Sequence, residues 1–215
     1  EDGETEADAI VRALETAAHG LRLRDTLAGA AAGRGLTDRP VIEMQIERRP
    51  AVVEGDSCGS AGKGEAADPA QGVQPCDQLW LVLTNTSGKA QDVSVLYFST
   101  DFSVAPIWPV NNLANRLAPG ESVTIGLQIA PGSTAGLEEI WVLAVPESDT
   151  GARVDLTRLA SPEMTRDFAG ASDEMTLWLE GRMIDPAEAA MRGFSLKPAA
   201  LTMIRQVVRL KPGTD

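Results

Sequence analysis

The sequence predicts a mainly β protein: an antiparallel β-sandwich, Ig-like or related, with an N-terminal helix and a short C-terminal α segment. Three apolar runs in the middle of the chain carry this prediction: Leu79–Leu83, Val93–Phe98 and Ile140–Val145. They are rich in β-branched and aromatic residues, which favour strands. Turn-forming residues separate them, at Asn85–Gly88, Ala118–Gly120 and Pro131–Gly136. Short alternating strands joined by such turns are typical of sandwiches.

The segments around this centre fit the same architecture. Asp8–Ala32 is rich in Ala and repeats apolar residues at helical spacing, so we expect a helix that Gly20 weakens and that ends at 33–35. Val41–Arg49 alternates apolar and polar residues, as a strand with one buried face does. Further strands are predicted at Val104–Trp108, Ser122–Ile129 and Leu201–Leu210.

The remaining segments divide the chain into three parts. Residues 1–37 form the helix and a linker, residues 38–160 the sandwich core with a long exposed loop at 50–76, and residues 161–215 a C-terminal extension. Val154–Leu159 fits a strand or a helical turn, and 173–181 fits a helix or a strand. A short helix is predicted at 184–191, because Asp185-Pro186 is a good N-cap and N1 pair.

Composition narrows the classes of partner. Of the 215 residues, 43% are hydrophobic, which is enough for a core, and the formal net charge is −12. That charge argues against nucleic acid and against an anionic membrane surface, since both need clustered Lys and Arg. No apolar run approaches the roughly 20 residues of a membrane span. The chain begins with Glu1 rather than Met, so we expect a fragment or a processed chain, and a missing signal peptide carries no information.

The chain has two cysteines, Cys58 and Cys76, near the two ends of a stretch rich in Gly, Ala and Pro. An even number of cysteines around one loop favours a disulfide, with two free thiols as the alternative. Closing such a loop stabilises a protein by about 3 kcal/mol in the chain-entropy model. A disulfide would also indicate an oxidising compartment.

One motif suggests catalytic chemistry. Asp56–Ser60 reads DSCGS and resembles the nucleophile signature of metacaspase-type cysteine peptidases, where Asp-x-Cys-His-Ser-Gly follows a buried strand. Cys58 would then be the nucleophile and His19 its activating base. However, Gly59 replaces the His of the signature, no buried strand precedes it, and His19 lies inside a helical pattern. We therefore predict a structural cysteine and no catalytic residues, with the Cys58–His19 dyad as an alternative.

Metal and cofactor chemistry are not expected. His19 is the only histidine, and metal sites usually need several His, Cys or carboxylate ligands at defined spacing. No segment matches a phosphate-binding Gly loop or a hydrolase nucleophile elbow. The acidic pairs Glu138-Glu139 and Asp173-Glu174 are interpreted as solvated loop charges.

The connection from Asp101 to Leu117 is the best candidate binding region. It holds Trp108 near three polar residues, which are Asn112, Asn115 and Arg116. An aromatic residue and an Arg amid polar groups are enriched at interface hot spots. The alternative is that Trp108 plugs the end of the sandwich, because Trp on strands more commonly packs in a core.

Several short segments of the centre match one family in order. They are Thr84–Thr86, Val95–Tyr97 before Asp101-Phe102, Ile107–Pro109, Asn115–Glu121 and Glu139–Pro146. Through them Asp77–Pro146 resembles the C-terminal β-domain, a domain of unknown function, that lies behind caspase-like (metacaspase-type) peptidase domains in bacteria. The preceding helix and first strand also fit, so the resemblance covers roughly the first three quarters of the chain. The matching motifs are structural rather than catalytic.

The resemblance implies a non-catalytic module of a larger, often exported peptidase. We therefore expect a binding or regulatory module that acts by docking to the caspase-like peptidase domain or to another protein. One alternative is a fragment of a caspase-like cysteine peptidase that uses Cys58 and His19. A second is a carbohydrate- or peptide-binding β-sandwich with a groove near Trp108. The predicted disulfide and the resemblance together favour a periplasmic or extracellular location.

Overall fold

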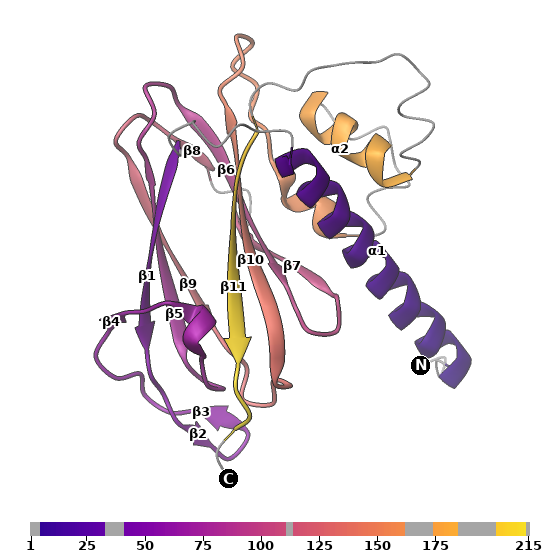
Figure 1. Cartoon of the computed structure of the whole chain (residues 1–215), viewed down its shortest axis with the longest axis vertical. Coiled ribbons are helices and arrows are strands. Elements are labelled where there is room, and N and C mark those ends of the chain that lie inside the picture. Colours follow the sequence, from indigo (N-terminus) through magenta and orange to yellow (C-terminus); the bar gives the residue numbers. More distant parts are fainter. Residues whose placement is uncertain (1–4, 33–40, 111–113, 162–173, 185–200, 214–215) are drawn as a thin grey trace.

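The computed structural model describes residues 5–32, 41–110, 114–161, 174–184 and 201–213. Within these ranges the fold is mainly β, as predicted, with two large antiparallel sheets and two α-helices (Figure 1). The sheets face each other as a sandwich, and the helices lie against one of them (Figure 1). The molecule therefore has three layers.

The first sheet has the strand order β4-β1-β5-β9. Its strands are β4 (Glu65–Ala66), β1 (Ile42–Arg49), β5 (Gln78–Asn85) and β9 (Ser122–Gln128). Strand β5 shows why the sequence pattern works: Leu79, Leu81 and Leu83 are fully buried, while the residues between them are half-buried on the outer face. One face of this sheet thus meets the sandwich core and the other meets solvent.

The second sheet has the order β11-β10-β6-β7, with β8 also paired to β6. Its strands are β11 (Thr202–Leu210), β10 (Gly136–Pro146), β6 (Gln91–Phe98), β7 (Val104–Trp108) and β8 (Arg116–Leu117). The middle strands β6 and β10 are buried on both faces. Val95 and Val142 point into the sandwich core, whereas Leu96 and Leu143 belong to a second core under the helices. Near-continuous apolar runs are typical of strands covered on both sides.

The helical layer covers the outer face of the second sheet. It consists of α1 (Glu6–Ala32), the 3-10 turn η2 (Leu156–Ala160) and α2 (Glu174–Ile184). The core that they share with the sheet includes Leu23 and Leu27 of α1, Leu156 and Leu159 of η2, and Leu179 of α2. Two ambiguous predictions are thereby settled: the segment predicted at 154–159 forms a helical turn over Leu156–Ala160, and the segment predicted at 173–181 forms a helix over Glu174–Ile184. The helix predicted at 184–191 and the linker at 161–171 lie almost wholly outside the described residues.

The segment at 50–76 is more ordered than the predicted loop. It contains the short strands β2 (Val53–Glu54) and β3 (Ser57–Cys58), then β4, then the 3-10 turn η1 (Pro69–Gln71). Strands β2 and β3 pair around Gly55, whose φ of +63° suits a tight turn. Val73 forms a parallel bridge with Leu210, which joins this segment to the second sheet. Main-chain pairing orders a stretch whose side chains have little to bury.

Candidate functional site

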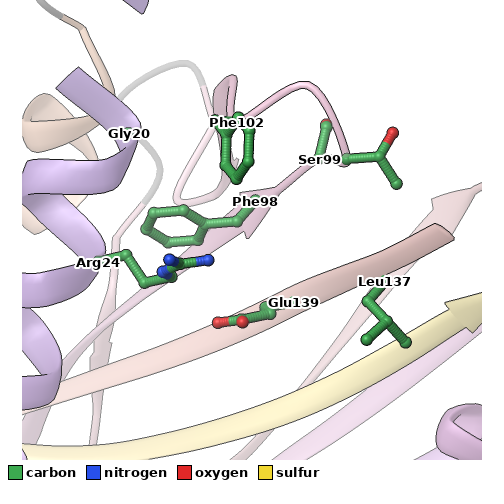
Figure 2. A pocket seen from close by; sticks show the side chains of 8 residues that line it. Gly20, Arg24, Phe98, Ser99, Phe102, Leu137 and Glu139 are labelled. Carbon is green, nitrogen blue, oxygen red and sulfur yellow. The ribbon is translucent and has the colours of Figure 1, made fainter. Parts of the chain in front are cut away.

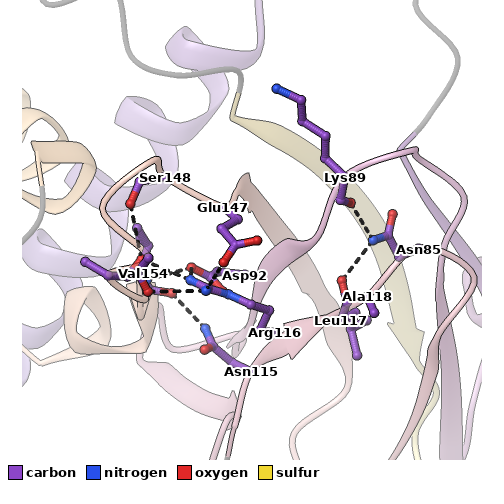
Figure 3. Close-up of polar contacts among 12 residues, drawn as sticks. Asn85, Lys89, Asp92, Asn115, Arg116, Leu117, Ala118, Glu147, Ser148 and Val154 are labelled. Atoms are coloured by element: carbon purple, nitrogen blue, oxygen red, sulfur yellow. Dashed lines mark hydrogen bonds and ion pairs between the residues drawn. The ribbon is translucent and has the colours of Figure 1, made fainter.

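The predicted binding residues Trp108, Asn115 and Arg116 are engaged within the molecule. Trp108 is only 8% exposed and belongs to the sandwich core, which favours the packing alternative for this side chain. Asn115 is 3% exposed, and its Nδ2 donates to the carbonyl oxygen of Val154 at 2.7 Å (Figure 3). Asn112 lies outside the described residues. The three described side chains therefore stabilise the fold.

Arg116 is the centre of a polar network at the end of the second sheet (Figure 3). Its Nε and Nη2 donate to the two carboxylate oxygens of Asp92 at 2.8 and 3.0 Å. Its Nη1 pairs with Glu147, and it also donates to the carbonyl oxygens of Gly151 and Ala152. The hydrogen bonds with Asp92 are the main reason why the pKa of Arg116 is raised. The network fastens the 147–154 connection to β6 and β8.

The cysteine prediction agrees with the structure. The sulfurs of Cys58 and Cys76 lie 2.09 Å apart, at disulfide distance. His19 is 3% exposed on α1, and its Nε2 lies 2.8 Å from the carbonyl oxygen of Leu159. Burial is the main reason why its pKa is lowered, so the neutral ring donates Nε2–H to that carbonyl. Cys58 is thus paired with Cys76, and His19 is hydrogen-bonded to η2.

Two acidic residues that we interpreted as solvated loop charges are buried in β10. Tyr97 donates its hydroxyl to Glu138, and burial is the first cause of the raised pKa of that hydroxyl. Glu139 accepts from Arg205 Nε at 2.9 Å and from Trp141 Nε1 at 2.7 Å. Burial alone would raise the pKa of Glu139, but these hydrogen bonds and the charges of Arg205 and Arg24 together outweigh it, and the pKa is lowered. The interpretation of Glu138 and Glu139 as solvated loop charges was wrong, because each has a hydrogen-bond partner on a neighbouring strand that is distant in sequence, Tyr97 on β6 and Arg205 on β11.

A small cavity lies between α1, the β6–β7 hairpin and β10 (Figure 2). Arg24, Phe98, Phe102 and Glu139 are among its lining residues, and the Arg24 side chain extends toward Glu139. Its volume is about 40 Å³. Small-molecule sites typically measure about 300–1,000 Å³, so this cavity is too small for such a ligand.

A shallow hollow of about 210 Å³ lies on the outer face of the first sheet, at Trp80 and not at Trp108. The Trp80 ring lies against Gly126 of β9, where an added Cβ would sit 3.3 Å from the ring. The Arg49 guanidinium lies 4.5 Å from the centroid of the same ring. Because Trp80 already has these intramolecular contacts, the hollow is a weak candidate for binding carbohydrate.

Among the described residues, no group of three or more His, Cys, Asp or Glu side chains is placed to hold a metal ion. The helices of that part of the chain include none that is both long and apolar enough to cross a membrane.

The strongest candidate for a functional surface is the N-terminal half of α1. It projects away from the sheets (Figure 1), and residues 5–15 are all exposed. Ile10, Val11 and Leu14 are exposed by 54%, 54% and 64%. These residues supplied the periodicity that predicts the helix. The side of α1 that packs on the sheet is a different one, formed by His19, Leu23 and Leu27.

In comparisons with known proteins, no family model matched the chain and no curated protein was significantly similar to it.

Proposed function

We propose that this chain is a non-catalytic module that docks to another protein through the exposed apolar side of α1. The observation that carries the proposal is the exposure of Ile10, Val11 and Leu14 on one projecting helix. Contiguous apolar side chains on a helix surface are characteristic of helix-in-groove recognition and of helix pairing.

The proposed partner is a caspase-like peptidase domain of the same larger protein. The resemblance of Asp77–Pro146 supports this choice. The disulfide-distance pair Cys58–Cys76 is compatible with an oxidising compartment, and we propose the periplasm or the exterior of the cell. The full open reading frame tests the partner directly: a frame that encodes no peptidase domain would remove that part of the proposal.

Binding measurements test the docking part. The variant with Ile10→Gln and Leu14→Gln removes two exposed apolar side chains but keeps good helix formers. Against the peptidase domain, calorimetry should show about 30-fold weaker binding, which corresponds to a hot-spot loss of about 2 kcal/mol. The unfolding free energy should change by less than about 0.5 kcal/mol, since both sites are exposed.

Leu177→Gln is the matched control, because Leu177 is also an exposed leucine on a helix, 42% exposed on α2. It should bind like the unmodified chain. If the α1 double variant also binds like the unmodified chain, the docking role of α1 is wrong.

A further inference from the structure

Strand β9 forms one edge of the first sheet, with β5 as its neighbour on the inner side. Just before β9, the main-chain oxygen of Glu121 accepts from Asn85 N at 2.9 Å. Just after it, Ile129 N donates to the main-chain oxygen of Asp77 at 3.0 Å. Alternate residues of an antiparallel pair form these bonds. The main-chain N–H and C=O groups of the intervening residues therefore point away from β5: Ser122, Thr124, Gly126 and Gln128.

The outward main-chain groups of β9 have no partner in the part of the chain that the structure describes. No hydrogen bond among those residues uses an outward N–H or C=O group of this strand. The four residues that carry these groups are all exposed. A row of unpaired main-chain donors and acceptors on an exposed edge is a template for pairing with another extended chain.

The other outer strands of the two sheets carry features that oppose such pairing. Strand β4 has only two residues, one of which is Glu65. Strand β7 contains Pro106, which has no N–H to donate, and β11 carries Arg205 and Arg209. Short strands, Pro and charge are the usual protections of a sheet edge. Strand β9 has none of them, because its seven residues include neither Pro nor a charged side chain.

The hollow at Trp80 lies beside this open edge. Trp80 and Gly126 are directly paired across β5 and β9, and the ring lies against the glycine. The volume of about 210 Å³ is below the roughly 300 Å³ of small-molecule sites and suits a single side chain. On a strand added to β9, the residue opposite Gly126 points to the same face of the sheet. Its side chain would enter the hollow and contact the ring of Trp80.

The residues at this edge indicate the chemistry of the added strand. Neither β5 nor β9 contains a charged residue, so a charged side chain laid beside them would lose water without gaining a partner. The ring of Trp80 favours an apolar side chain. In an antiparallel pair of two β9 strands, the residue opposite Gly126 would be one of the four outward residues of the other copy. None of these has a large apolar side chain, so a second copy leaves the hollow unfilled.

We propose that the outward edge of β9 binds an extended, uncharged peptide segment of a partner protein. The segment adds antiparallel to β9 as a further strand of the first sheet and places one apolar side chain in the hollow between Trp80 and Gly126. Main-chain hydrogen bonds hold the segment, and the hollow selects the side chain. The inference goes beyond the docking role of α1, because α1 packs on the second sheet (Figure 1).

Hydrogen exchange of the free chain, followed by NMR, tests whether the edge is open. The N–H groups of Thr124 and Gly126 should exchange at least about 100-fold faster than those of Ile125 and Leu127, which face β5. If Thr124 and Gly126 are as protected as Ile125 in dilute protein, the edge is already covered and the proposal is wrong. If their protection appears only as the concentration of the chain rises, a second copy occupies the edge and the peptide is wrong.

A blocked heptapeptide tests binding directly. The probe is acetyl-Ser-Thr-Val-Phe-Val-Thr-Ser-amide, in which the central Phe is meant to lie opposite Gly126. Titrated to about 1 mM, it should shift the amide signals of Thr124 and Gly126 and the indole N–H signal of Trp80. Replacing the Phe by Ser should weaken binding about tenfold, since the hollow is then empty. An absence of shifts at about 1 mM, or equal binding of the two peptides, overturns the proposal.

Two methylated forms of the probe test the main-chain hydrogen bonds on the unmodified chain. In the proposed register the N–H of the Phe points at β9, whereas the N–H of the next Val points away from it. Methylation of the Phe nitrogen should weaken binding about tenfold or more, and methylation of the Val nitrogen should change it by less than about threefold. Equal losses would show that the peptide does not bind as an added strand.

A matched pair of chain variants tests the same edge from the other side. Thr124→Pro removes one outward N–H, and Pro is accepted on edge strands where that group faces solvent. It should bind the probe about tenfold more weakly, whereas Thr124→Val keeps the N–H and should bind like the unmodified chain. A folded Thr124→Pro variant that binds as tightly as the unmodified chain overturns the proposal. If Thr124→Pro does not fold, the two methylated peptides decide the question.

The α1 double variant separates this inference from the proposed function. The variant with Ile10→Gln and Leu14→Gln should bind the probe like the unmodified chain, because neither residue lies on the first sheet. Weaker probe binding by this variant would place the peptide on α1 and overturn the inference. Loss of binding to the peptidase domain alone leaves the β9 edge intact.

Discussion

At the scale of single residues, His19 links α1 to η2 in a way that depends on its charge. Its Nε2 lies 2.8 Å from the carbonyl oxygen of Leu159, and the side chain is 3% exposed. Burial lowers the pKa of His19, the hydrogen bond to Leu159 opposes that effect, and nearby Arg22 adds to it. The folded protein therefore favours the neutral imidazole.

This lowered pKa predicts a loss of stability in mild acid. Below the ordinary pKa of about 6.5, unfolded His19 takes up a proton that the folded state resists. The stabilisation is complete above that value, and it declines as the pH falls from about 6.5 through the lower folded pKa. His19→Gln keeps an N–H donor but does not titrate. Urea unfolding at several pH values should show a steeper loss for the unmodified chain between about pH 7 and pH 5, and equal slopes would contradict the prediction.

A second residue-scale prediction concerns Arg116. Its guanidinium donates two hydrogen bonds to the fully buried carboxylate of Asp92. It also donates to the carbonyl oxygens of Gly151 and Ala152. Arg116→Lys keeps the charge but loses the forked geometry, so it should lower the unfolding free energy by about 2 kcal/mol. Arg49→Lys is the control, because Arg49 pairs with Glu47 and lies over the Trp80 ring in a half-exposed setting that Lys can also occupy, so it should cost less than about 1 kcal/mol. If the two variants lose similar amounts of unfolding free energy, the burial of Asp92 does not determine the effect of Arg116→Lys.

At the scale of elements, α1 depends on one glycine where it crosses the β6–β7 hairpin. A Cβ added at Gly20 would lie 1.9 Å from the carbonyl oxygen of Phe102. Glycine usually weakens a helix, and the sequence predicts such a weak point here. The helix instead runs unbroken from Glu6 to Ala32. The absence of a side chain at Gly20 lets the backbone of the hairpin come close to the helix.

Two glycine variants in the same helix should therefore have opposite effects. Gly20→Ala should lower the unfolding free energy by about 2 kcal/mol or more, since main-chain atoms must move to relieve the clash. Gly29→Ala should raise it by up to about 1 kcal/mol, because no atom lies within 4 Å of the added Cβ and Ala favours helix. Chemical unfolding measures both. A stabilising Gly20→Ala would show that the close contact with Phe102 is absent.

The elements differ in how much of them the sequence could predict. Strand β5 was predictable because Leu79–Leu83 is a short apolar run bounded by turn-forming residues. Its buried face was not, because Trp80 and Val82 between the leucines are apolar too. In α1 the periodicity identified the helix but not its packed side, because the more continuous apolar stripe, which includes Ile10 and Leu14, is the outward one. Local pattern shows that a helix has an apolar side, and only the tertiary fold decides which side is covered.

The candidate sites were less predictable than the elements. The Cys58–Cys76 pairing followed from counting and spacing. The internal roles of Asn115 and Arg116 did not, because their partners lie 24 to 39 residues away in sequence. Composition suggested a hot spot, but long-range hydrogen bonds decide whether such residues face a partner or the protein itself.

At the scale of the whole molecule, the second sheet belongs to two cores at once. Its inward side chains, among them Val95 and Val142, pack in the sandwich core. Its outward side chains, among them Leu96 and Leu143, pack under the helices. Loss of the helical layer would expose one face of β6 and β10, two strands that are apolar on both faces. We therefore expect the helices and the sandwich to unfold together.

Leu179→Ala tests this coupling from the far side of the molecule. Leu179 of α2 is fully buried in the core under the helices, so its truncation should cost about 3 kcal/mol. If unfolding is cooperative, hydrogen exchange followed by mass spectrometry should show the same loss of protection in β5 of the first sheet as in α2. Leu177→Ala on the same helix should change neither region, because Leu177 is 42% exposed. Loss of protection confined to α2 would mean that the helical layer opens on its own and that the sandwich is stable without it.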